Sequence, residues 1–229
     1  MSGDHYSINT TWYLELNRIA RHSGWAHGVM AFYSHFFGLA LLALLLLAAW
    51  WKARSDARPA RAVAGVLWAA GGTVLAWVVA HMGLKPLVDE RRPYLTLSHV
   101  EVLLHRTSGP SFPSGHATIA GAVIVGLWLA RRWLAAVVAT VLGLLLCFGR
   151  VYTGMHYPLD VLAGLMVGAV VVAVLWLPVV AALTWWDSRL LHTGLAPLVA
   201  TTPRRGRSSI GRHSPPPGAT TGAGETGAT

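Results

Sequence analysis

The chain has 229 residues, of which 54% are hydrophobic and only 12% are charged, and its formal net charge is +9. Soluble proteins carry about 25% charged residues, so this composition excludes an ordinary soluble domain and predicts a membrane protein. Lys and Arg lie between apolar segments and in the C-terminal tail, a pattern typical of membrane topology, and we expect no nucleic-acid partner. The single cysteine, Cys147, excludes an internal disulfide.

Residues 1–28 are too polar to form a secretory signal, although apolar residues recur in them at helical spacing. Ile8, Trp12, Leu16 and Ile19 would share one side of a helix, with charged residues elsewhere on the turn. We therefore predict a short amphipathic helix lying in the membrane interface. A helix packed directly on the rest of the protein is the alternative interpretation.

Five apolar segments follow, and each is a candidate transmembrane helix. They cover approximately residues 29–51, 62–84, 117–130, 133–148 and 159–183. The third and fourth are short for a bilayer, and we expect the third to begin within residues 114–116. Tryptophans occur near the segment ends, as in an aromatic belt: Trp50, Trp51, Trp133, Trp185 and Trp186. The sequence thus predicts an all-α polytopic membrane helix bundle over residues 29–190, with five spans, or six if the N-terminal segment also crosses.

Residues 201–229 are rich in Pro, Gly, Ser, Thr and Arg and contain almost no large apolar side chains. Such a composition cannot build a packed core, so we expect a disordered C-terminal tail.

The predicted topology brings three polar clusters to one side of the membrane. With five spans, the loop after the second apolar segment and the loop after the fourth share a side, and these loops hold the clusters. Most Lys and Arg residues fall on the other side, in the 52–61 loop, the 131–132 turn and the tail. Since positive residues favour the cytoplasm, we predict a protein of the cytoplasmic membrane whose clusters face the extracytoplasmic side.

The first cluster places Lys85, Arg91 and Arg92 directly after an apolar segment. Cations at this depth are costly unless an anion compensates them. Arg offers a planar fork to phosphate oxygens and Lys a point charge, so Lys85 and Arg92 are candidate phosphate ligands. A solvated basic run that holds the helix end is the alternative.

The second cluster is Pro113-Ser114-Gly115-His116, just before the third apolar segment. Small residues at a helix start leave backbone N–H groups free for an anion, and the Ser114 hydroxyl is a further donor. Gly115 lets a phosphate approach the backbone, and His116 can supply a proton near neutral pH. The alternative is a capping turn with a buried, hydrogen-bonded histidine.

The third cluster contains Arg150, His156 and Asp160. His156 and Asp160 are four residues apart, and Pro158 suits the first turn of the helix that follows. A carboxylate bonded to one imidazole nitrogen leaves the other nitrogen as a nucleophile or base. A buried structural His–Asp pair is the alternative.

The three clusters together suit phosphoryl transfer. Lys85, Arg92 and Arg150 would neutralise the phosphate, the contribution that usually dominates this catalysis. His156 would attack phosphorus to form a phosphohistidine, and His116 would protonate the leaving oxygen and later activate water. We expect neither a metal nor another cofactor, because the cations already supply the positive charge and the acidic residues on that side form no evident cage.

Three motifs resemble, in the same order, the signature motifs of the type 2 phosphatidic acid phosphatase (PAP2) superfamily: Lys85-x6-Arg92-Pro93, Pro113-Ser114-Gly115-His116 and Arg150-x5-His156-x3-Asp160. The resemblance covers about residues 29–183 and departs at Gly149, where the third motif often has serine. It implies a helical bundle, a lipid phosphate substrate, a metal-independent phosphohistidine mechanism and the residue roles given above.

Within that superfamily the short chain and outward site look most similar to bacterial undecaprenyl-diphosphatases of the bacitracin-resistance type. This resemblance implies conversion of undecaprenyl diphosphate to undecaprenyl phosphate, which recycles the carrier lipid for cell wall synthesis. Phosphatidylglycerophosphate, phosphatidate and other polyprenyl phosphates are alternative substrates. A non-enzymatic anion channel or carrier is the alternative of a different class, although it would need neither the His–Asp pair nor the proton donor. The oligomeric state is left open.

Overall fold

The structure, a computed structural model, describes residues 7–201. Within this range every regular element is a helix, and no β-strand occurs. The predicted all-α fold is therefore confirmed for the described part of the chain. The predicted disordered tail concerns residues that, apart from Thr201, lie outside the described range.

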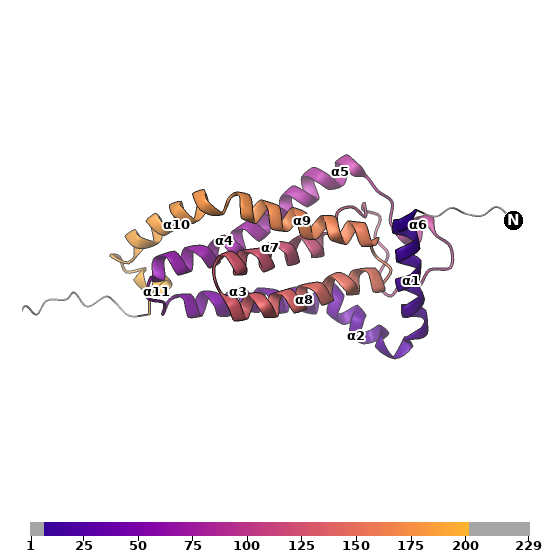
Figure 1. Cartoon of the computed structure of the whole chain (residues 1–229), viewed down its shortest axis with the longest axis horizontal. Helices are drawn as coiled ribbons and strands as arrows, with labels where there is room; N and C mark the ends of the chain where they lie inside the picture. The colour runs from indigo at the N-terminus through magenta and orange to yellow at the C-terminus, as the bar shows by residue number, and fades with distance from the viewer. Residues whose placement is uncertain (1–6, 202–229) are drawn as a thin grey trace, which may run out of the picture.

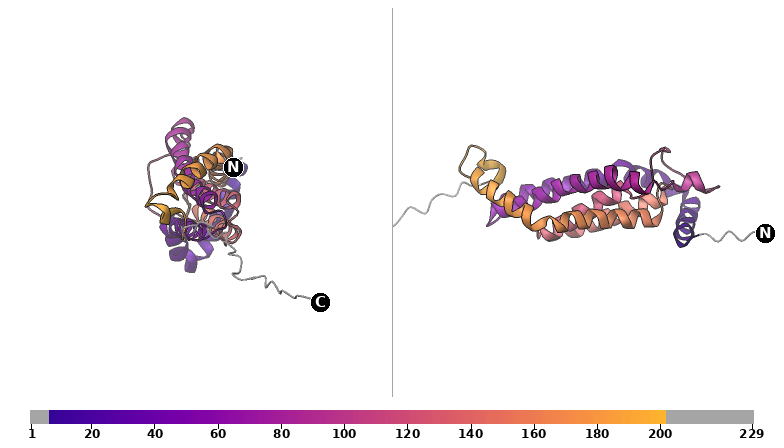
Figure 2. Two further views of the ribbon diagram at one scale, coloured as in Figure 1. Left: turned by 90° about the vertical axis from the view of Figure 1, so that its left-hand side faces the viewer. Right: turned by 90° about the horizontal axis from the view of Figure 1, so that it is seen from above.

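Aligned helices form an elongated bundle, with α3, α4, α7, α8 and α9 running along its length (Figures 1 and 2). The helices in chain order are α1 (Ile8–His22), η1 (Gly24–Ala26), α2 (His27–Phe32), η2 (Tyr33–Phe37), α3 (Gly38–Ala53), α4 (Pro59–Val78), η3 (Val79–Leu84), α5 (Lys85–Val88), α6 (Pro93–Thr96), α7 (Gly115–Leu129), α8 (Trp133–Tyr152), α9 (Pro158–Val174), α10 (Trp176–Leu190) and α11 (Ala196–Val199). Of the η elements, η1 is a 3₁₀-helix, whereas η2 and η3 are π-helical segments that continue into α3 and α5.

The bundle is a membrane bundle by helix length and composition. Gly24–Ala53, Pro59–Thr96 and Trp133–Tyr152 are each long and apolar enough to cross a bilayer. The bent pair of α9 and α10 provides a fourth candidate if it counts as one span, and α7 is a shorter apolar helix. The number of five spans therefore stays a prediction.

The expected fifth apolar helix is in fact two helices, because α9 ends at Val174 and α10 begins at Trp176 with a bend of 54° between them. Pro178 explains the break. Proline has no N–H to donate to the carbonyl four residues earlier, and its ring clashes there, so a straight helix cannot continue from Val174.

Helix α7 is the centre of the packing, with α4, α8 and α9 around it. Its closest neighbour is α9, and glycines make that approach possible. A Cβ at Gly168 would lie 2.0 Å from the carbonyl oxygen of Thr118, and one at Gly164 would lie 2.5 Å from that of Ser114. Small residues let membrane helices pack backbone against backbone, which fixes the start of α7 against α9.

The outer surface of the bundle is apolar, as expected for contact with lipid tails. Leu134, Val141, Leu47 and Val170 are among the many large apolar side chains that are more than half exposed. Arg54 lies over the Trp51 ring at 4.0 Å, and Arg189 over the Trp185 ring at 4.6 Å. Such Trp–Arg pairs at helix ends suit the boundary between lipid and water.

Helix α1 runs across one end of the bundle, at a large angle to the long helices (Figures 1 and 2). Its inner side is buried through Tyr13, Asn17 and Ala20, whereas Ile8 and Trp12 remain exposed. One side of α1 thus packs on the bundle, and the position of the helix in a membrane interface stays a prediction.

Candidate functional site

The three polar clusters meet at the end of the bundle that α1 covers (Figure 1). The segment from Asp89 to Ser114 and the turn between α8 and α9 lie there together. Leu103 N donates to Thr153 O at 3.1 Å, and Ser114 N donates to Asp160 O at 3.0 Å. At the opposite end, Arg132 in the α7–α8 turn pairs with Asp56 in the α3–α4 loop at 2.8 Å. The two loops that hold the clusters thus lie at the same end of the bundle, whereas their side of the membrane stays a prediction.

His156 and Asp160 form a buried pair at the start of α9. His156 Nδ1 lies 3.5 Å from Asp160 Oδ2, and the side chains are 3% and 0% exposed. Pro158 is the first residue of α9, as predicted, and Asp160 Oδ2 accepts a bond from Tyr157 N at 2.9 Å. The carboxylate therefore caps the helix and faces the histidine at once, which fixes both groups relative to α9.

Ser111 completes this pair, although the sequence analysis missed it. Its side chain is fully buried, and its Oγ donates to Asp160 Oδ2. Ser111 Oγ also lies 3.4 Å from His156 Nδ1. With Asp160 and Ser111 both on the Nδ1 side, the proton is assigned to Nδ1, and Nε2 keeps its lone pair. Ser111 lies two residues before Pro113-Ser114-Gly115-His116, but an isolated serine in a loop carries no periodic signal that would single it out.

Burial controls the charge state of His156. The apolar surroundings lower its pKa from 6.5 to about 3, and the cations of Arg150 and Arg92 act in the same direction against the opposing effect of Asp160. The ring is therefore neutral at physiological pH, which is the form that can act as a nucleophile.

Lys85 and Arg92 are held by backbone carbonyl groups of one loop. Lys85 Nζ donates to Pro110 O at 2.8 Å, and Arg92 Nε donates to Gly109 O at 2.9 Å. Arg92 also reaches the other loop of the site, since Nη1 donates to Met155 O at 3.1 Å. Both side chains are buried, and carbonyl oxygens orient these cations without neutralising them.

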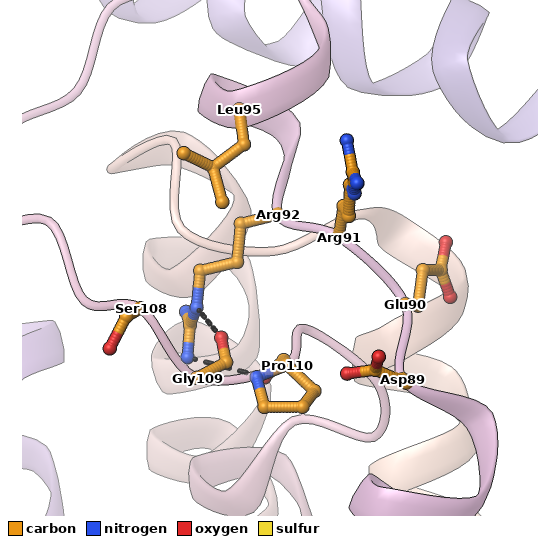
Figure 3. A pocket seen from close by; sticks show the side chains of 8 residues that line it. All are labelled: Asp89, Glu90, Arg91, Arg92, Leu95, Ser108, Gly109 and Pro110. Carbon is orange, nitrogen blue, oxygen red and sulfur yellow. Dashed lines mark hydrogen bonds between the residues drawn. The ribbon is translucent and has the colours of Figure 1, made fainter.

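Arg92 also lines a cavity of about 340 Å³ that opens beside the site. Figure 3 shows its side chain extending to the Gly109 and Pro110 segment, with Asp89, Glu90 and Arg91 on the chain leading to it. The cavity thus gives access to Arg92, whereas the exposed Arg91 stands at the rim and does not join the buried group.

Arg150 comes from the last turn of α8 and is 5% exposed. Its Nη1 donates to Ser34 O at 3.1 Å, and its Nε is buried without a hydrogen-bond partner. Gly149, where a serine occurs in the related motif, lies so close to Ser34 that a Cβ would be 2.8 Å from the Ser34 Cβ. A side chain at position 149 would therefore compete with Ser34, which explains why glycine suits this chain.

The start of α7 places Ser114, Gly115 and His116 in the site. The helix begins at Gly115 with Ser114 at its N-cap, as predicted, but the Ser114 hydroxyl does not cap it and is buried without a partner. Gly115 faces Trp77, whose Nε1 would lie 3.5 Å from an added Cβ. His116 Nε2 lies 3.2 Å from His35 O, in the π-helical segment η2.

The assembled group is cationic and has unused hydrogen-bonding capacity. The positive charges of Arg92 and Arg150 disfavour protonation of both His116 and His156. Residues from all three clusters are therefore close enough to interact electrostatically. Ser114 Oγ and Arg150 Nε are buried donors without a protein partner. Buried donors beside several cations favour an anion with many acceptor oxygens, such as a phosphate group. In residues 7–201, no three His, Cys, Asp or Glu side chains are grouped as metal ligands would be.

Comparison with known proteins agrees with this geometry. The PAP2 superfamily model matches residues 63–183, which include every candidate site residue. The chain is 28% identical over 156 residues to undecaprenyl-diphosphatase BcrC of Bacillus subtilis, covering 68% of this chain and 76% of the relative. It is 32% identical over 99 residues to an undecaprenyl-diphosphatase of Sulfolobus acidocaldarius, covering 42% of this chain and 46% of that protein.

Two solved structures share the fold. The structure of LpxE from Aquifex aeolicus matches with a TM-score of 0.52 at 21% identity, covering 76% of this chain and 98% of that one. The PAP2-type phosphatidylglycerolphosphate phosphatase of Bacillus subtilis matches with a TM-score of 0.54 at 20% identity, covering 81% and 89%. At these identities the likeness concerns the fold alone.

Proposed function

The chain belongs to the PAP2 superfamily and is a membrane phosphatase, and from that membership we propose that it converts undecaprenyl diphosphate to undecaprenyl phosphate. The observation that carries the proposal is the convergence of the buried cations Lys85, Arg92 and Arg150 with the His156–Asp160 pair. The names of two relatives, each an undecaprenyl-diphosphatase, support this substrate over phosphatidate or phosphatidylglycerophosphate.

In the proposed first step, His156 Nε2 attacks the terminal phosphorus of the diphosphate. The P–N bond forms as the bond to the bridging oxygen breaks, which gives a phosphohistidine and the lipid monophosphate. Asp160 and Ser111 hold the Nδ1 proton and stabilise the positive charge that the ring gains. Neutral His156 is available for this attack because of its lowered pKa.

His116 is the proposed proton donor for the leaving oxygen. It acts in its doubly protonated form: Nε2–H faces the carbonyl of His35, and the proton on Nδ1 passes to the leaving oxygen as the P–O bond breaks, which leaves His116 neutral. In the second step the same nitrogen takes a proton from water as the water attacks the phosphohistidine. The P–N bond breaks, inorganic phosphate is released, and His156 returns to its neutral form.

The phosphate oxygens are proposed to bind Lys85, Arg92 and Arg150, together with the Ser114 hydroxyl and the backbone N–H of Gly115. Ser114 Oγ and Arg150 Nε, which lack protein partners, are the donors most available to an anion. Three cations in a dry site stabilise the charge that develops on the transferred group, which is why the proposal contains no metal or other cofactor.

We further propose that residues 29–190 form the phosphatase domain and that residues 1–28 lie in the membrane interface. The site would face the extracytoplasmic side of the cytoplasmic membrane, where the diphosphate of the carrier lipid is exposed. The exposed apolar side chains of α1, among them Ile8 and Trp12, support the interfacial position.

The decisive experiment measures phosphate release by the purified protein in detergent. We expect release from undecaprenyl diphosphate in the presence of a chelator, and much slower release from phosphatidate and phosphatidylglycerophosphate. A requirement for added divalent metal would contradict the metal-independent mechanism, and a preference for either glycerolipid would replace the proposed substrate.

The nucleophile is tested in the same assay. His156→Ala should abolish release and should also abolish the phosphate label on the protein after an acid-free quench of a reaction with terminally labelled substrate. His192→Ala changes an exposed histidine on the far side of the bundle and should behave as wild type. A labelled His156→Ala protein would disprove the assignment of the nucleophile.

A further inference from the structure

Asn17 is a fully buried polar side chain in α1 that the proposed mechanism does not use. Its side-chain Nδ2 donates to Glu101 O at 2.8 Å, and its Oδ1 accepts from Glu101 N at 2.9 Å. One side chain thus satisfies both backbone groups of a residue 84 positions away in the chain. These two hydrogen bonds resemble those between neighbouring β-strands, and they fix the position of the Glu101 backbone relative to α1.

Glu101 lies where the two loops of the site touch. The Glu101 carbonyl packs on Gly154, so closely that a Cβ at Gly154 would lie 2.3 Å from it, and Gly154 has φ +79°. Gly154 is two residues before His156. On the other side of the contact, Tyr13 of α1 donates its hydroxyl to Gly154 O at 3.4 Å, so α1 holds both loops at the same point.

The loop that Asn17 holds also carries the partners of the cations. Residues 97–114 leave α6, pass Glu101, and supply the carbonyls of Gly109 and Pro110 to Arg92 and Lys85. The same loop then provides Ser111 to the His156–Asp160 pair. A movement of Glu101 would therefore displace both the turn that carries His156 and the loop whose Ser111 orients Asp160.

We infer that α1 is a clamp on the catalytic loops and that Asn17 is a positioning residue for His156. The inference rests on the proposed function for its kinetic readout. The three cations lie outside the loop that Asn17 holds, since Lys85 belongs to α5, Arg92 precedes α6 and Arg150 belongs to α8, so their charges stay in the site and substrate binding should be largely preserved when the clamp is released. The rate of the chemical step should fall, because His156 and its orienting groups lose their common anchor.

The test compares Asn17→Ala with Glu15→Ala, because the Glu15 side chain is exposed on the same helix and pairs with Arg18. For undecaprenyl diphosphate hydrolysis, we expect Asn17→Ala to lower kcat about 10- to 100-fold, the usual cost of a misplaced reacting group, with little change in KM. Glu15→Ala should keep the wild-type kcat and KM. Wild-type kcat in Asn17→Ala, or a loss confined to KM, would overturn the inference.

Asn17→Asp gives a readout that a loss of folding cannot imitate. A protonated carboxyl offers one donor and one acceptor, as the amide does, whereas a carboxylate has no donor for Glu101 O. The kcat of Asn17→Asp relative to wild type should therefore rise as the pH falls, and a ratio independent of pH would contradict the hydrogen-bonded role.

Hydrogen exchange separates this inference from the proposed function. Peptides covering residues 97–110 should exchange faster in Asn17→Ala than in wild type, while peptides of α7 and α9 keep their protection. If the wild-type protein hydrolyses none of the lipids, the proposed function fails and this measurement alone decides on the clamp. Unchanged exchange in residues 97–110 would rule the clamp out.

Discussion

The hydroxyl of Ser111 lies between the two groups of the proposed nucleophilic pair, with Asp160 Oδ2 as its acceptor and His156 Nδ1 beside it. Asp160 Oδ2 accepts hydrogen bonds from both Ser111 Oγ and Tyr157 N, and these two bonds hold the carboxylate in one orientation. The imidazole that faces this oxygen is therefore restricted in rotation. Orientation of a nucleophile by groups that never touch the substrate is a consequence of burial as much as of hydrogen bonding.

Ser111→Ala should lower kcat about 10-fold, which corresponds to the loss of one hydrogen bond to a charged group. KM should change little, because Ser111 has no hydrogen bond to the cations that are proposed to bind phosphate. Steady-state kinetics on the purified variant check this expectation, and Ser98→Ala, which alters an exposed serine of the same loop away from the cavity, is the matched control. Equal kinetics of the two variants would show that Ser111 has no orienting role.

The buried, neutral His156 makes stability depend on pH in a defined direction. Its folded-state pKa of about 3 lies below the value of 6.5 expected in an unfolded chain, so the unfolded state binds more protons between these values. The protein should lose stability as the pH falls from 6.5 toward 3 and show no contribution from this residue above 7. His156→Gln should show a smaller fall in melting temperature over the same range in detergent, and an identical fall would contradict the assignment.

At the scale of the elements, the site depends on the close contact of α7 and α9. Ser114 at the start of α7 and Asp160 in the first turn of α9 are joined through Ser114 N and Asp160 O. This contact is possible because glycines on α9 let the backbones touch farther along the pair. Two helix starts then lie side by side, and each brings its own motif to the same place.

Gly168→Ala should destabilise the protein by about 1–3 kcal/mol, the usual cost of overpacking, since the new methyl group meets the backbone of α7. Gly71→Ala is the control, because an added Cβ there has no neighbour within 4 Å. Thermal unfolding in one detergent measures both. Equal stability of the two variants would mean that α7 and α9 separate at little cost.

The helix pattern was readable from the sequence because long uncharged apolar runs have few alternatives to a membrane helix. The helix break at Leu175 was not expected, because the apolar residues continue without interruption on both sides of Pro178 and hydropathy alone predicts one helix. The π-helical segments η2 and η3 were also missed, since a change in helical pitch leaves no mark on hydropathy. They matter for the site, because the carbonyls of Ser34 and His35 in η2 face Arg150 and His116.

Sequence spacing predicted the candidate site residues that carry charge, including Asp160 as the partner of His156, but it did not indicate Ser111 or Asn17. Lys85, Arg92, Arg150 and the His–Asp pair are conspicuous because ionisable groups beside membrane helices are costly. Ser111 and Asn17 are ordinary polar residues whose importance depends on contacts across 49 and 84 positions of chain. Only the three-dimensional structure brings those partners together.

At the scale of the whole molecule, the two ends of the bundle differ in their chemistry. One end holds the candidate site under α1, and the other holds the Asp56–Arg132 ion pair, where Arg54 O also accepts from Thr201 N at 3.2 Å. The C-terminal segment therefore leaves the described structure at the end opposite the site. The sequence that follows Thr201 is rich in arginine, and this supports the proposal that the far end lies in the cytoplasm.

The orientation is testable by thiol labelling in intact cells, in a Cys147→Ala background. Ala57→Cys lies in the exposed far-end loop and should react with an impermeant reagent only after the cells are permeabilised. Ser98→Cys lies in the exposed loop of the site and should react at once. The reverse pattern would place the site in the cytoplasm.

The carbonyl partners of the three cations bear on how a turnover ends. Lys85, Arg92 and Arg150 each donate to a backbone carbonyl oxygen, which is a neutral dipole. In the proposed reaction, these carbonyl dipoles would stay beside the buried cations after inorganic phosphate has left and would offset part of the cost of their burial. The same backbone oxygens would also orient Lys85, Arg92 and Arg150 toward the next lipid phosphate, so one set of carbonyls would serve both the release of product and the binding of substrate.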